Sequence, residues 1–386
     1  MNTVQTPLQR GGMLIVLHPV FALTGIADAI VGPILPSLAR TYQLSDSQSG
    51  VLFFWIFAGM ATGALLCRGD YARILMAGLL AMTVGCLCFP WIPRPVLYPF
   101  VFFFGVSIGA PMTAISLFAG RNFPAHRAST LTMLNFTWSA GAMLAPLLAA
   151  RMLAVSSWRS VYLVLACASA VAFVSVVFTI RDSNEPAHIT PETTEVRNLR
   201  IVALFAFFFF FEVGMETMFG AWIPTFVLRS TRTTMELAAT AGSIYWTGFI
   251  VSRALSPLLL WRVRSGRFLQ FALPTALLAS LLLIGTRTAA LTCTGVLLLG
   301  LALAPIFPVA LAAFLDRARH SSDSRFILAL SGFGGSLFPW LAGWISSRTG
   351  SLQAGLLIGP ATLLSMMGML PLLGVSGSKE PDTRGE

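Results

Sequence analysis

The chain has 386 residues, is 56% hydrophobic and 10% charged, and carries a formal net charge of +10. Its recurring apolar runs are about 20 residues long, enough for a helix to cross a hydrocarbon layer roughly 30 Å thick, and they exclude an ordinary soluble domain. Because the basic residues stand singly or in small groups between these runs, the charge indicates membrane topology and excludes a nucleic-acid-binding surface.

Twelve apolar runs predict an all-α membrane protein with twelve transmembrane helices. They cover residues 13–38, 50–67, 74–92, 96–119, 129–150, 159–180, 200–228, 237–261, 268–286, 288–315, 326–345 and 352–374. The first run is too long for a signal peptide and carries an acid in a motif that recurs later, so it is counted as a span. The five cysteines form no CxxC pair and no histidine stands at ligand spacing, so no disulfide framework, metal site or cofactor is predicted.

One long polar stretch, residues 181–199, has no apolar periodicity and is predicted to be a cytoplasmic linker. It separates an N-terminal six-helix bundle (1–180) from a C-terminal six-helix bundle (200–376), which a cytoplasmic tail (377–386) follows. With the N-terminus inside, the inner segments hold 16 Lys and Arg residues and the outer segments hold eight, while Arg253 belongs to neither set. This excess predicts a multi-pass protein of the cell membrane with both termini cytoplasmic.

The two bundles share motifs at half-chain separation. A D-x3-G-x3-P motif begins at Asp28 in the first span, and E-x3-G-x3-P begins at Glu216 in the seventh, 188 residues later. G-x4-P motifs begin at Gly141 in the fifth span and at Gly334 in the eleventh, 193 residues apart. Such repeats indicate duplication and two pseudo-symmetric bundles.

These motifs resemble those of the major facilitator superfamily. The segment SSWRSVY (156–162) is similar to that superfamily's GWRxxF signature, and the G-x4-P of the fifth span is similar to its span-five motif. The superfamily's loop motif between spans two and three is present in degraded form as CRGDYAR (67–73). The resemblance covers the whole six-linker-six layout and implies the major facilitator fold, with a central substrate cavity between the bundles.

A second resemblance concerns sugars. The stretches VGMETMFGAWIPT (213–225) and WTGFIVSR (246–253) are similar to the VGxExxFGxW and WxGxxxGR patterns of the fucose/galactose/glucose symporter branch. The branch's proton symporters carry acids in spans one and four. Here the fourth span has no acid, and Asp28 lies two turns before Pro36 instead of one. Coupling by the branch's own acid pair is therefore not implied.

Three acids in the middle of spans are the candidate proton-coupling residues, because an ionisable group at the bilayer centre costs several kcal/mol and needs a partner or a function. Asp28 lies halfway along the first span among small residues. Glu212 and Glu216 lie one turn apart on one face of the seventh span. Two carboxylates so close cannot both ionise easily, so a shared, exchangeable proton is expected. The alternative is that these acids are structural and satisfied by neighbouring helices.

Arg253 in the eighth span lies at a depth similar to that of Glu212, so an ion pair between them is geometrically allowed. Asp28 is a competing partner, and an unpaired Arg253 would favour an anionic substrate. Amide and aromatic groups within spans suit a sugar, which takes hydrogen bonds through its hydroxyls and stacks on rings. The candidate substrate-binding residues are Asn135, Trp138, Trp222, Tyr245, Trp246 and Arg253.

The sequence favours a secondary transporter that works by alternating access, with proton-coupled uptake of a sugar or related small polar solute as the main hypothesis. The expected partners are this solute, protons or alternatively sodium as coupling ion, and the lipid bilayer, with the protein a monomer. A proton-driven exporter of drugs or metabolites, a non-coupled facilitator and a receptor remain as alternatives. No GxSxG, HExxH or phosphate-loop motif supports an enzyme.

Overall fold

A computed structural model describes residues 7–123, 127–180, 199–260, 265–315 and 321–373, and within these ranges the chain is helical, with no strand. The predicted tail, and the predicted linker up to residue 198, lie outside the described residues. The first half consists of α1 (Pro7–Ala29), α2 (Val31–Tyr42), α3 (Asp46–Leu66), α4 (Tyr71–Cys88), α5 (Leu97–Asn122), α6 (Arg127–Val155) and α7 (Trp158–Thr179). The second half consists of α8 (Leu199–Thr231), α9 (Met235–Leu260), α10 (Ser265–Gly285), α11 (Ala289–Leu303), α12 (Ile306–Leu315), α13 (Ser321–Thr349), α14 (Leu352–Leu356) and α15 (Ile358–Met369).

These helices confirm the predicted twelve-span architecture. In the described part of the chain, nine helical segments are long and apolar enough to cross a membrane, and the bent pair α1 and α2 makes a tenth span. The pairs α11–α12 and α14–α15 each form a single span among the nine. The remaining two predicted spans correspond to the long helices α9 and α13, which contain Ser, Thr and Gly, as is usual for membrane helices that pack against other helices more than against lipid.

The duplication seen in the sequence reappears as equivalent packing within each half. A Cβ atom at Gly141 of α6 would collide with the backbone carbonyl of Ala22 in α1. A Cβ at Gly334 of α13 would collide with the carbonyl of Phe210 in α8, and these two residues stand at the repeat offsets from Gly141 and Ala22. Glycine is required at both positions because the helix backbones touch there.

The WRSVY segment at the start of α7 anchors one end of the first half. Trp158 is buried, and its Nε1 donates a hydrogen bond of 3.0 Å to the Thr41 hydroxyl at the end of α2. The Arg159 Nε donates to the carbonyl of Pro90, also at 3.0 Å. Trp158 and Tyr162 pack edge-to-face on Phe89. The motif therefore ties α7 to the ends of α2 and α4 through hydrogen bonds and ring contacts.

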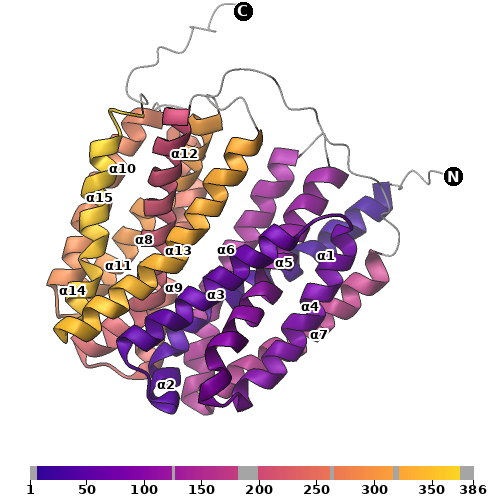
Figure 1. Ribbon diagram of the computed structural model, residues 1–386, viewed down its shortest axis with the longest axis horizontal. Helices are drawn as coiled ribbons and strands as arrows, with labels where there is room; N and C mark the ends of the chain where they lie inside the picture. Colours follow the sequence, from indigo (N-terminus) through magenta and orange to yellow (C-terminus); the bar gives the residue numbers. More distant parts are fainter. Residues whose placement is uncertain (1–6, 124–126, 181–198, 261–264, 316–320, 374–386) are drawn as a thin grey trace, which may run out of the picture.

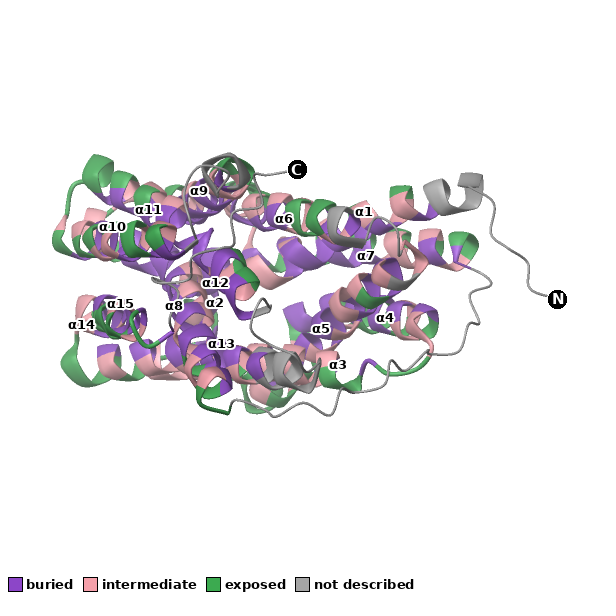
Figure 2. Ribbon diagram, turned by 90° about the horizontal axis from the view of Figure 1, so that it is seen from above, coloured by how far each residue is buried: buried purple, intermediate pink, exposed green. Residues whose placement is uncertain are grey.

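The two halves lie beside each other in Figure 1, with indigo-to-magenta helices in one and pink-to-yellow helices in the other. Figure 2 shows the buried residues on the inner faces of the helices, both within each half and where the halves face each other, with exposed residues along the outside. We call the end where α2 leads into α3 (residues 42–46) the α2–α3 side, and the end where α3 leads into α4 (residues 66–71) the α3–α4 side.

Close contacts between the halves gather on the α2–α3 side. A Cβ at Gly50 of α3 would lie 2.8 Å from the Trp340 Cα in α13, and one at Gly32 of α2 would lie 2.8 Å from the Gly220 carbonyl in α8. At Gly242 of α9, a Cβ would lie 2.8 Å from the ring of Pro146 in α6. Backbones at this spacing leave no passage between them, so the halves are closed against each other on this side.

Candidate functional site

The first span is broken at the level of Asp28. The direction of the helix changes by 42° between the two parts, α1 and α2. Pro33 has no N–H to donate to the carbonyl four residues earlier, so the helix loses a hydrogen bond where α1 ends at Ala29. Asp28 consequently lies next to a helix break within the membrane, where its side chain is half-buried.

Asp28 and Glu216 occupy equivalent positions in the two halves and lie near each other. Each stands one turn before the glycine of its own motif, and those glycines, Gly32 and Gly220, are in close contact. The two carboxyl groups are near enough to interact electrostatically. The Glu216 side chain is half-buried like that of Asp28. The repeated motif therefore brings one acid from each half to the same region of the interface.

Glu212 lies one turn from Glu216 but in a different environment. Its side chain is fully buried, and neither carboxyl oxygen has a hydrogen-bond partner among the residues that the structure describes. Glu212 and Glu216 interact electrostatically with each other. An ionised carboxylate without a partner is unfavourable at such a position, so Glu212 is suited to holding a proton.

Arg253 of α9 faces these acids without forming a close ion pair. It interacts electrostatically with both Glu212 and Glu216, but in the described part of the chain no acid lies within 4.0 Å of it. Its Nη1 instead donates a hydrogen bond of 2.9 Å to the Ser139 hydroxyl of α6, in the other half. The direct Glu212–Arg253 ion pair that the sequence allowed is therefore not formed, because the guanidinium is hydrogen-bonded to Ser139.

Two tryptophans meet across the interface beside this charged group. Trp138 of α6 and Trp246 of α9 are in edge-to-face contact, with ring centroids 5.6 Å apart. The Trp138 indole N–H is buried and has no partner among the described residues. Tyr245 donates its hydroxyl to the Glu216 backbone carbonyl at 3.2 Å, which holds α9 against α8. The site thus has an apolar wall with one free hydrogen-bond donor.

The other two candidates lie apart from this group. Asn135 is exposed one turn before Ser139, and its amide donates to the Leu131 carbonyl of its own helix at 2.9 Å. Trp222 is fully buried beyond the Gly32–Gly220 contact, where its Nε1 donates to the Pro339 carbonyl at 2.9 Å. The structure therefore groups Asp28, Glu212, Glu216, Arg253, Trp138, Tyr245 and Trp246, and separates Asn135 and Trp222 from them.

Comparison with known families decides what kind of protein this architecture belongs to. A sequence model described as Major Facilitator Superfamily matches residues 17–325. The chain belongs to this superfamily. It is accordingly a multi-pass membrane transporter of a small-molecule substrate and not an enzyme, and the expected fold is confirmed.

Several curated superfamily members are similar over most of the chain. The glucose/mannose transporter GlcP of Bacillus subtilis is 23% identical over 367 residues, covering 89% of this chain and 90% of that protein. A glucose/galactose transporter of Brucella abortus biovar 1 is 24% identical over 371 residues, covering 88% and 89%. The human sodium-dependent glucose transporter 1 is 26% identical over 277 residues, covering 60% and 53%.

Solved superfamily structures share the fold. The nucleoside transporter NupG, as its D323A mutant, matches with a TM-score of 0.74 at 13% sequence identity, covering 95% of this chain and 99% of that one. A bacterial homologue of the human lysosomal transporter Spinster, in an inward-facing and occupied conformation, matches with a TM-score of 0.71 at 15% identity, covering 96% of both chains.

Sequence reasoning missed two polar contacts of this transporter. His18 of α1 and Thr137 of α6 are 2.8 Å apart between Nδ1 and Oγ1, within the first half. Asp46, the first residue of α3, accepts two hydrogen bonds of 2.6 Å from Arg229 at the end of α8 and another from Ser346 of α13. Asp46 and Arg229 stand 183 residues apart next to apolar spans, and no local pattern signals that they meet.

Proposed function

We propose that this transporter carries hexoses together with protons by alternating access between two bundles. The observation that carries the proposal is the juxtaposition of Asp28 and Glu216, equivalent acids from the two halves that interact across the interface. Both side chains are half-buried, whereas Glu212 behind them is fully buried. A proton is the simplest ligand for such a group, because its binding removes the repulsion between the carboxylates.

This arrangement links protonation to conformation. Gly32 and Gly220 can touch only when the α2–α3 side is closed, and closure brings Asp28 and Glu216 together one turn away. Protonation of either acid lowers the electrostatic cost of closure, so a lower pH favours the closed α2–α3 side. A substrate that binds between the halves experiences the same equilibrium, and its movement thereby becomes coupled to the proton.

The relatives' names and the chemistry of the aromatic pair support a sugar as substrate. Three relatives are named as transporters of glucose together with mannose or galactose, or of glucose with sodium. Trp138 and Trp246 offer ring surfaces for the C–H face of a pyranose, and the free indole N–H of Trp138 suits a sugar hydroxyl. Arg253 and Ser139, which are hydrogen-bonded to each other, contribute further polar groups from the same two helices, α9 and α6.

The topology proposed for this cycle places the α3–α4 side in the cytoplasm. The positive-inside excess of 16 basic residues against eight supports this assignment. Both termini then lie inside a cell membrane, with residues 1–180 and 200–376 as the two bundles joined by a linker. A monomer is sufficient for the cycle, because both halves of the site belong to one chain.

Uptake into liposomes tests this function. Purified protein is reconstituted, an inward proton gradient is imposed, and uptake of a radiolabelled hexose panel is measured for wild type, Glu216→Gln and Asp28→Asn. We expect gradient-driven accumulation in wild type, and an accumulation ratio near unity in either variant because the exchangeable carboxyl is lost. Glu236→Gln, which changes an acid at the start of α9 outside the group, is the matched control and should retain accumulation.

Further arms separate the alternatives. Hexose counterflow without a gradient should persist in Glu216→Gln but lose its dependence on pH, since counterflow needs alternating access without net proton movement. Accumulation driven by a sodium gradient but not by a proton gradient would show that sodium is the coupling ion and refute proton coupling. Uptake without accumulation in wild type would indicate a facilitator and refute coupling, and failure to carry any hexose would favour the exporter.

A further inference from the structure

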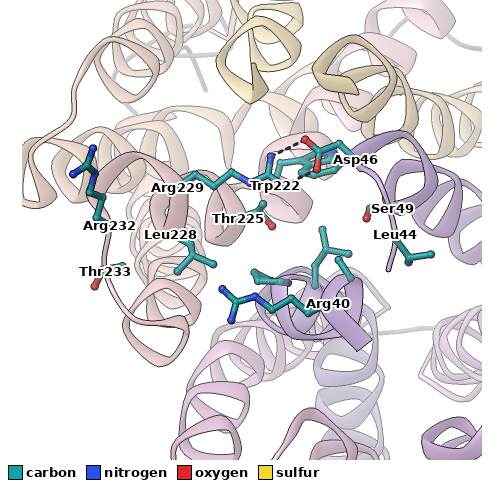
Figure 3. A pocket seen from close by; sticks show the side chains of 13 residues that line it. Arg40, Leu44, Asp46, Ser49, Trp222, Thr225, Leu228, Arg229, Arg232 and Thr233 are labelled. Atoms are coloured by element: carbon teal, nitrogen blue, oxygen red, sulfur yellow. Dashed lines mark hydrogen bonds and ion pairs between the residues drawn. The ribbon is translucent and has the colours of Figure 1, made fainter. Parts of the chain in front are cut away.

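A separate cavity of about 540 Å³ lies on the α2–α3 side, beyond the Gly32–Gly220 contact. Its walls come from the end of α2, the start of α3, the end of α8 and the turn that follows α8. Figure 3 shows Arg40 on one wall, with Thr225 and Leu228 facing it and Asp46 and Arg229 bonded together at another edge. A cavity of this volume is within the range of small-molecule sites.

The cavity carries excess positive charge. Arg229 is neutralised by its two bonds to Asp46. Arg40 and Arg232 also line the cavity, and within the described ranges neither guanidinium forms an ion pair or hydrogen bond. Arg40 belongs to the first half of the molecule and Arg232 to the second. Two unpaired guanidinium groups at one cavity create a potential that attracts anions.

A buried hydroxyl supplies an independent indication of a ligand. Thr225 is only 3% exposed, lines the cavity, and has no hydrogen-bond partner for its Oγ1 among the residues described. Helical threonines usually bond the carbonyl one turn earlier, as Thr231 does with Val227. A buried hydroxyl without a hydrogen-bond partner is unfavourable, so a ligand in the cavity that accepts a hydrogen bond from it would be stabilised.

We propose that this cavity binds a small anion bearing a carboxylate or phosphate group. Arg40 holds the anionic oxygens, Thr225 donates its hydroxyl to the same ligand, and Arg232 adds to the attraction at the rim. Leu35, Pro36 and Leu228 provide apolar walls, so the ligand is an organic anion or a lipid headgroup more readily than a fully hydrated ion. Because Arg40 and Thr225 belong to opposite halves, the bound anion holds the α2–α3 side closed.

Calorimetric titration of citrate and of inorganic phosphate into the purified transporter in phosphatidylcholine nanodiscs tests the site without a transport assay. We expect saturable citrate binding in wild type that weakens about tenfold or more in Arg40→Gln, since a charge-assisted bond is lost. Arg151→Gln removes an exposed arginine on the same side, away from the cavity, and is the matched control. No citrate binding in wild type, or equal binding in Arg40→Gln and wild type, overturns the proposal.

Thr225→Val sharpens the test, because its two effects run in opposite directions. Removal of the unsatisfied hydroxyl should raise the melting temperature of the anion-free protein, while citrate binding should weaken several-fold. A lower melting temperature combined with unchanged citrate affinity would show that the hydroxyl has no role in binding and count against the site. This combination distinguishes a missing ligand contact from a general loss of structure.

Lipid composition distinguishes the two sources of the anionic group. If a phospholipid headgroup occupies the cavity, phosphatidylglycerol nanodiscs should lower the apparent citrate affinity of wild type but not that of Arg40→Gln. If the ligand is a soluble anion, the affinity should be the same in both discs. Spin labels across the α2–α3 side should also show a larger closed fraction when citrate is added, and a citrate-induced opening would contradict the bridging role.

Discussion

The halves of this transporter meet along two interfaces on the α2–α3 side, and different chemistry holds each one. Between α3 and the pair α8 and α13, Asp46 accepts two hydrogen bonds from Arg229 and one from Ser346, and the Ser47 backbone N–H donates to the Ser347 hydroxyl at 2.7 Å. Between α9 and the pair α2 and α6, glycine and proline make the contact. Gly242 lies against the rings of Pro33 and Pro146.

The internal repeat explains why the interfaces resemble each other and where they diverge. Glu236, at the start of α9, stands 190 residues after Asp46 and retains the acid. Thr41 stands 188 residues before Arg229, so the second interface has no arginine at that position. The Thr41 hydroxyl accepts a hydrogen bond from Trp158 instead. Glycine stands at a close contact in both interfaces, at Gly50 in the first and Gly242 in the second, whereas the Asp46–Arg229 ion pair belongs to the first.

The largest effect is expected from adding a methyl group where the backbones touch. In Gly343→Ala the new Cβ would collide with the Asp46 carbonyl, which cannot move without its helix. In Gly242→Ala it would meet the Pro146 ring, whose pucker can adjust. Overpacking costs about 1–3 kcal/mol, so Gly343→Ala should open the α2–α3 side at least as far as Gly242→Ala does.

Pulsed electron–electron double resonance measures that opening as the distance between spin labels at Arg151 and Arg287, which are exposed residues of the two halves on this side. Gly368→Ala is the control, because a Cβ there has no atom within 4 Å. A larger opening in Gly242→Ala than in Gly343→Ala would contradict the idea that backbone contact limits the first interface.

A smaller effect is expected from removing charge. Asp46→Asn breaks the ion pair with Arg229, whose side chain is 50% exposed, while that of Asp46 is 16% exposed. After allowance for solvent screening, the pair stabilises the closed α2–α3 side by about 1 kcal/mol or less. The open population of Asp46→Asn should therefore exceed that of wild type several-fold at most. This difference should disappear at high salt, which screens the ion pair. Glu236→Gln should change neither the distance distribution nor its salt dependence. An equal response of both variants would mean that the interfaces do not differ in charge.

The smallest effect is expected at the second interface. Ser243 of α9 donates its hydroxyl to the Met143 carbonyl of α6 at 2.9 Å, across the halves. Ser243→Ala should weaken closure by about 0.5 kcal/mol, the lower end of the usual net contribution of one hydrogen bond. Ser175→Ala, which removes a hydroxyl bonded within α7, is the control in the same spin-label measurement. An unchanged distance distribution in Ser243→Ala would mean that packing alone holds this interface closed.

Much of the candidate site was visible in the sequence because intramembrane charges are rare and conspicuous. Asp28, Glu212, Glu216 and Arg253 were all identified from their depth in apolar runs. Their partners were not. The sequence allowed a direct Glu212–Arg253 pair, whereas the fold turns the guanidinium toward Ser139 of another helix.

The arginine-lined cavity had no signal in the sequence. Arg40, Arg229 and Arg232 each lie between spans, where they count toward topology like any other basic residue. Their convergence depends on the ends of α2 and α8 meeting, a contact between segments far apart in the chain. Trp222 likewise appeared suited to a substrate, but the fold buries it against α13 with its indole N–H satisfied.

The sequence by itself determined the membrane environment, the twelve helices, the duplication and the presence of buried acids, because each depends on local apolar length or on short repeated motifs. Only the tertiary structure decided which side is closed, which groups pair across the halves, and where cavities remain. These features depend on backbone approach between distant helices, which glycine permits but does not specify, so they follow from how the two bundles dock.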